Sequence, residues 1–148
     1  MRRALAVPLA AVAYATTGCG GGHPPLSTLC VQGEEPIVRA LQRAPANVAL
    51  ADGTPLSQCV AGARDAGDLQ SFGVLVVHVA DRLADRALRD RRAALRLGYL
   101  IGAAERGAAH SNGIHAELVH RLEVTARRVP GDSSATLERG RRAGQRSG

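Results

Sequence analysis

The chain has 148 residues, which suits a single domain, and a formal net charge of +6 that is confined to its two ends. Residues 19–126 contain 11 arginines and 11 acidic side chains, so the central part of the chain is neutral. With two Tyr, one Phe and no Trp in the whole chain, the basic ends lack the aromatic side chains that stack on bases. Composition and charge therefore exclude a typical nucleic-acid-binding protein.

The first 18 residues have the composition of a signal peptide. Arg2-Arg3 forms a basic start, and the apolar run 4–15 that follows is too short to span a membrane stably. Ala13 and Ala15 fit the small-x-small pattern of ordinary signal peptidase. One expected product is therefore a plain secreted protein cleaved after Ala15.

A second processing site follows directly. Residues 16–19, Thr-Thr-Gly-Cys, resemble the lipobox of bacterial lipoproteins. This resemblance implies cleavage before Cys19, a diacylglyceryl group on its sulfur and a membrane-lipid anchor for the mature chain. The three glycines at 20–22 are suited to a flexible tether. We expect lipoprotein processing, with secretion after Ala15 as the alternative.

The cysteine count favours the lipoprotein. If Cys19 carries lipid, Cys30 and Cys59 remain as an even pair outside the cytoplasm, whereas cleavage after Ala15 leaves one thiol unpaired. Cys59 lies on the apolar face of an expected helix, and Cys30 lies in the leader at 19–33. We predict a disulfide between them that ties the leader to the helical domain, with two separate buried thiols as the alternative.

Two short helices are expected at the start of the domain. Residues 34–36, Glu-Glu-Pro, favour a first helical turn, and Pro45 ends this helix. A second short helix is predicted over 54–67, with Thr54 as its N-cap and Gly67 at its end.

Residues 68–108 form the longest stretch with helical periodicity. Apolar side chains recur at three- or four-residue steps from Leu69 onward, and the stripe is interrupted by the charged residues 89–92. We predict two antiparallel helices joined by a short turn, with Asp68 capping the first. One continuous helix is the alternative, because neither Gly nor Pro forces the break.

The second of these helices carries Gly98 and Gly102 four residues apart, a small-residue face against which a neighbouring backbone can pack closely. A last helix is predicted over 112–129, with Ile114 and Leu118 pointing inward. The expected fold class is therefore all-α, a small bundle of three longer helices plus two short N-terminal helices.

Residues 130–148 are rich in Gly, Ser and Arg and contain a single Leu, a composition that predicts a disordered tail. The expected organisation is a signal peptide at 1–18, a tether at 19–33, an α-helical domain at 34–129 and this tail.

Glu117 and His120 are the best candidates for metal ligation. They stand three residues apart and project from one helical face, which is half of the ligand pattern of di-iron carboxylate bundles. The chain has no second Glu-x-x-His step, and the same spacing fits a solvated helix face. His78 lies in an apolar run and is expected to be partly buried, with its ring bonded to a backbone carbonyl.

The sequence carries none of the nucleophile, phosphate-loop or dinucleotide motifs that define common enzyme classes. We therefore expect an exported cell-envelope lipoprotein that is a non-catalytic binding module and needs no cofactor. Its expected partners are membrane lipid, through the acylated Cys19, and an envelope protein, without nucleic acid. A metal-binding bundle that uses Glu117 and His120 is the alternative function.

Overall fold

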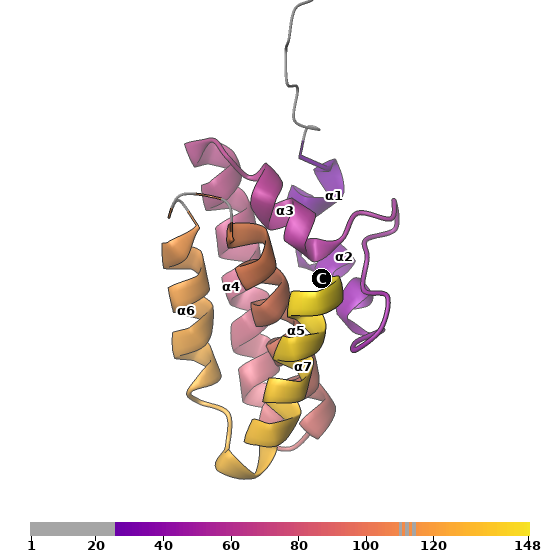
Figure 1. Cartoon of the computed structure of the whole chain (residues 1–148), viewed down its shortest axis with the longest axis vertical. Helices are drawn as coiled ribbons and strands as arrows, with labels where there is room; N and C mark the ends of the chain where they lie inside the picture. The colour runs from indigo at the N-terminus through magenta and orange to yellow at the C-terminus, as the bar shows by residue number, and fades with distance from the viewer. Residues whose placement is uncertain (1–25, 110, 112, 114) are drawn as a thin grey trace, which may run out of the picture.

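The computed structural model describes residues 26–109, 111, 113 and 115–148 (Figure 1). The predicted signal peptide, both cleavage sites and Cys19 lie outside the described residues, as does Ile114. The described part is helical and contains no β-strand, which confirms the all-α prediction. Its elements are α1 Thr28–Val31, α2 Glu34–Leu41, α3 Leu56–Gly62, α4 Ala66–Ala87, α5 Arg91–Ala108, α6 Ala116–Ala126, the 3-10 helix η1 Gly131–Ser133 and α7 Ser134–Ser147.

Helix α5 is the centre of the bundle. Figure 1 shows α4, α5, α6 and α7 along the long axis of the molecule, with α1, α2 and α3 packed against their upper part. Eleven of the 18 residues of α5 are buried, because α3, α4, α6 and α7 all contact it. Most of these eleven are Ala, Gly, Leu or Ile, so the helices pack closely with few large side chains. Among the described residues, no helix is long and apolar enough to cross a membrane.

Residues 68–108 form two helices rather than one. The chain turns after α4, where the backbone amides of Arg89 and Asp90 both bond to the carbonyl of Arg86. The Asp90 side chain then accepts a hydrogen bond from the Arg92 amide at 2.8 Å and so caps the start of α5. The first backbone amides of a new helix have no acceptor within that helix. The Asp90 carboxylate supplies an acceptor to one of them and so stabilises the break between α4 and α5.

The start of α4 differs from the prediction. Helix α3 ends at Gly62 rather than Gly67, and α4 begins at Ala66 with Asp65, not Asp68, as its N-cap. The Asp65 carboxylate accepts a hydrogen bond from the Asp68 amide at 2.8 Å, and this bond lowers the pKa of Asp65. Both aspartates precede an apolar stripe, so the sequence pattern alone does not separate the cap from a first-turn acid.

The predicted disulfide is confirmed. Cys30 in α1 is bonded to Cys59 in α3, with their Cα atoms 5.6 Å apart and both side chains fully buried. The bond fixes the first described helix against the bundle. Because α1 is only four residues long and most of its residues are not buried, we expect this covalent link to hold the leader in place.

The predicted disordered tail is wrong. Residues 134–147 form α7, which lies alongside α5 and runs parallel to it (Figure 1). Gly98 and Gly102 of α5 face the α7 backbone, and Gly140 and Gly144 of α7 face the α5 backbone. A Cβ atom at any of the four glycines would lie well inside van der Waals contact distance of a carbonyl oxygen of the other helix. The small-residue face predicted on α5 therefore has its partner in the segment that composition marked as disordered.

Charged groups also hold α7. Arg141 lies between α5, α6 and α7, where it pairs with Glu105 and, at 2.9 Å, with Glu123. The hydrogen bond that Arg141 donates to the Glu105 carboxylate raises the pKa of Arg141. On α5, Arg106 donates to the carbonyls of Gln145 and Arg146, which are acceptors left without helical partners at the end of α7.

Replacing Arg141 by glutamine is expected to lower the free energy of unfolding by about 1–2 kcal/mol, because it leaves the half-buried Glu105 carboxylate without its cation. The matched control is Arg39→Gln, since Arg39 pairs with Glu35 on an exposed helix face and its loss should cost only a few tenths of a kcal/mol, on the order of 0.3. Urea unfolding of both variants measures the difference. Equal effects would show that the Arg141 contacts do not hold α7.

Candidate binding groove between α4 and α6

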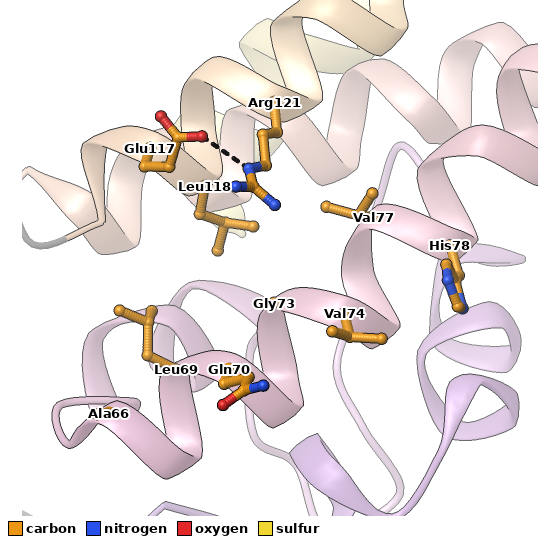
Figure 2. Close-up of a pocket in the computed structure, with 10 residues that line it drawn as sticks. All are labelled: Ala66, Leu69, Gln70, Gly73, Val74, Val77, His78, Glu117, Leu118 and Arg121. Carbon is orange, nitrogen blue, oxygen red and sulfur yellow. Dashed lines mark hydrogen bonds and ion pairs between the residues drawn. The ribbon is translucent and has the colours of Figure 1, made fainter.

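A surface groove lies between the first half of α4 and the first half of α6 (Figure 2). Its volume is about 480 Å³, and its lining is mainly apolar. We call it the α4–α6 groove. It is lined by Ala66, Leu69, Gln70, Gly73, Val74, Val77, His78, Glu117, Leu118 and Arg121.

Helix α4 carries two apolar stripes, and the groove is lined by the second. The first stripe includes Phe72, Val76 and Val79, which are buried in the core. The second stripe lies beside the first on the helix surface. It contains Leu69 and Val77, which are only partly buried. Helix α6 does not cover this second stripe completely, so an apolar strip on α4 stays open to solvent.

The middle of the groove floor is formed by Gly73 and Val74. A Cβ atom at Gly73 would have no neighbour within 4 Å, so the space above this residue is open. Val74 is 50% exposed, and it is one of three exposed large hydrophobic side chains in the described residues, with Leu88 and Val124. Glycine in the middle of a 22-residue helix disfavours helix formation, and no turn or close helix contact requires it at this position. Because Gly73 has no side chain, the space above it in the groove stays open.

Charged side chains of α6 stand at the edge of the groove. Arg121 donates from Nε to the Glu117 carboxylate at 2.7 Å, and this hydrogen bond lowers the pKa of Glu117. Figure 2 shows the guanidinium of Arg121 directed from α6 toward α4, beside Leu118 and to the left of Val77. The side chains of Arg121 and Glu117 are 65% and 67% exposed, so they form a surface ion pair. An arginine has five N–H donors, and the bond to Glu117 uses one of them.

The two residues predicted as metal ligands do not converge. Glu117 lies at the α4–α6 groove and is paired with Arg121, whereas His120 borders a separate hollow next to Glu105 and Glu123. Within the described residues, no group of three His, Cys, Asp or Glu side chains is arranged to hold a metal ion. The i, i+4 spacing from Glu117 to Arg121 predicts the ion pair, and this pair accounts for Glu117 without a metal.

The histidine expected to be partly buried is exposed, and another one is buried. The side chain of His78 is 59% exposed and lies 3.6 Å from Glu34, not bonded to a backbone carbonyl. His115 is 1% exposed, and its Nε2 lies 2.8 Å from the carbonyl oxygen of Ala63. Sequence reasoning missed His115. Leu118 and Leu122 lie at i+3 and i+7 from His115, so His115 is on the same face as the inward leucines of α6. This spacing indicates that His115 is buried.

Compared with known protein families, curated proteins and solved structures, the chain matches none of them. The site is therefore interpreted from its own residues. The lining of the α4–α6 groove includes no Ser, Thr, Cys or Tyr that could act as a nucleophile, and Glu117 is held by Arg121. An open apolar floor with a cation at one edge is suited to binding a small molecule.

Proposed function

We propose that the protein is an exported cell-envelope lipoprotein, anchored to the membrane through an acylated Cys19, whose helical domain is a non-catalytic binding module. The observation that carries the binding role is the α4–α6 groove, an open apolar hollow on the surface of a small helical domain.

The disulfide supports the export part of the proposal. Cys30 and Cys59 are consumed by one buried bond, and such bonds persist in oxidising compartments outside the cytoplasm. Cys19 is then the single cysteine left over, and it stands at the lipobox-like position. An acyl group on its sulfur removes a thiol that would otherwise be free to cross-link.

The arginines of α7 support contact with a membrane surface. Arg139, Arg142 and Arg146 are exposed and spaced at i, i+3 and i+7, so they share the face of α7 that points away from α5. A cationic side chain near an anionic lipid surface contributes about 1 kcal/mol of attraction, which salt weakens. A tether of only a few residues before Leu26 would keep this face within reach of lipid head groups.

The anchor is tested by expressing the full chain and Cys19→Ser in a bacterium with lipoprotein processing, and following both through detergent phase partition. The wild-type chain is expected in the detergent phase, and the serine variant in the aqueous phase, because the serine oxygen is not acylated by this pathway. The matched control is Ser27→Ala, a change outside the lipobox-like segment that should leave partition unchanged. Identical partition of the wild type and Cys19→Ser would contradict the anchor.

A further inference from the structure

The size of the α4–α6 groove selects a small ligand over a protein partner. A volume of about 480 Å³ falls within the range of roughly 300–1,000 Å³ that is usual for small-molecule sites. A stable protein interface uses about 20–30 residues on each side, and an α-helix with its side chains is about 10–12 Å wide. The ten lining residues form a site for one narrow molecule.

The floor of the groove favours an aliphatic ligand. Its apolar contacts come from Leu69, Val74, Val77 and Leu118, and its lining contains no Phe, Tyr or Trp side chain. The nearby Phe72 is 1% exposed and faces the core. From Leu69 to Val77 the floor follows α4 for eight residues, which corresponds to about 12 Å along the helix axis. The open space over Gly73 lies in the middle of this path.

The edge of the groove favours an anionic end group on that ligand. The Arg121 guanidinium lies at the opening, where its Nε donates to Glu117, and it is directed from α6 toward α4 (Figure 2). A carboxylate matches the planar, forked donors of arginine in charge and in geometry. The side chain of Arg121 is 65% exposed, so its guanidinium stays accessible to a ligand while it is paired with Glu117.

We propose that the α4–α6 groove binds a single aliphatic chain that ends in a carboxylate, with the chain on the α4 floor and the carboxylate at Arg121. This inference names the ligand of the binding module and rests on that part of the proposed function. It does not depend on the anchor, because the groove lies wholly in the helical domain. A cell-envelope protein would meet such molecules at the membrane surface.

The test uses the mature chain with Cys19→Ser, so that no attached acyl chain competes for the groove. Octanoate, decanoate and dodecanoate are titrated below their micelle-forming concentrations, and binding is followed by calorimetry and by the NMR methyl signals of Val74, Val77 and Leu118. Affinity should rise about three- to fourfold for each added methylene until the floor is filled, as expected for burial of apolar surface. A cationic chain of equal length, decyltrimethylammonium, should bind about tenfold more weakly than decanoate.

Two variants separate the floor from the edge. Gly73→Leu fills the open space and should weaken decanoate binding at least tenfold, whereas Ser71→Leu, on an exposed face of the same helix outside the groove, should have no effect. Arg121→Gln should remove the preference for the carboxylate, and Arg39→Gln, which breaks a similar exposed pair, should keep it. Gly73→Leu favours helix, so loss of folding is not expected to obscure the result.

Several outcomes would overturn the proposal. Unchanged decanoate affinity in Gly73→Leu would place the ligand elsewhere, and equal affinity for both head groups would remove the role of Arg121. A dimer in native mass spectrometry that Gly73→Leu dissociates would assign the groove to a second copy of the chain. Membrane partition of the lipidated protein is a separate measurement, so loss of ligand binding with normal partition refutes the ligand and leaves the anchor standing.

Discussion

Replacing Gly98 by alanine is expected to lower the free energy of unfolding by about 2–3 kcal/mol, although alanine is the better helix former by about 1 kcal/mol. The added methyl group would press against the carbonyl oxygen of Leu137, a backbone atom that cannot move aside without shifting α7. We expect α7 to separate from α5 and become the first site of proteolysis. Urea unfolding and limited proteolysis of the variant measure both effects.

The matched control is Gly73→Ala in α4. Its new methyl group meets no atom within 4 Å, so the variant should gain about 0.5–1 kcal/mol from helix propensity alone. The same substitution thus has opposite signs in two long helices of one bundle. If Gly98→Ala were as stable as Gly73→Ala, the close packing of α5 against α7 would be wrong.

Removing the disulfide has the second large expected effect. The bond between Cys30 and Cys59 closes a loop over a sequence separation of 29 residues, and Cys30→Ser with Cys59→Ser should cost about 3–4 kcal/mol in the chain-entropy model. This is a large share of the stability of a small domain. The measurement is urea unfolding of the double variant beside the wild type, with and without reductant.

Reductant itself provides the control. It should lower the wild type to the stability of the double variant and leave the double variant unchanged, whereas Cys19→Ser alone should behave as wild type. Labelling provides an independent result, because Cys30 and Cys59 should not react with a thiol reagent in the unfolded, unreduced chain. Reaction at both positions would show that they are not bonded.

Much of the fold follows from apolar periodicity. The stripe that begins at Leu69 predicted α4, and the charged interruption predicted the turn that ends at Asp90. An inward Cys59, in a chain expected to be exported, predicted the disulfide to Cys30. In these cases a large side chain or a sulfur marks the buried face, so a pattern of residue types is sufficient to find it.

Helix α7 could not be found in the same way. Its buried face is made of Leu137, Gly140, Ala143 and Gly144, so Leu137 is the one large side chain on that face. Hydrophobicity assigns almost no signal to glycine, and helix propensity counts against it. What stabilises α7 is the close approach of two backbones and the ion pairs of Arg141, which exist only once α5 lies beside it.

The α4–α6 groove also depends on tertiary contacts. The sequence shows that Glu117 has His120 at i+3 and Arg121 at i+4, but the metal prediction used only the histidine. In the folded chain Arg121 is the partner of Glu117. That the second stripe of α4 stays partly uncovered follows from the angle and length of α6, which residue patterns do not specify.

The most direct test of an anchored binding module is the mass of the protein recovered from its own cell envelope, measured first native and then denatured. The denatured mass should correspond to a chain that begins at Cys19, carries acyl groups and lacks the two protons lost in the disulfide. The native mass should exceed it by the mass of an aliphatic carboxylate. An unmodified chain that begins at Thr16, with equal native and denatured masses, would contradict both the anchor and the ligand.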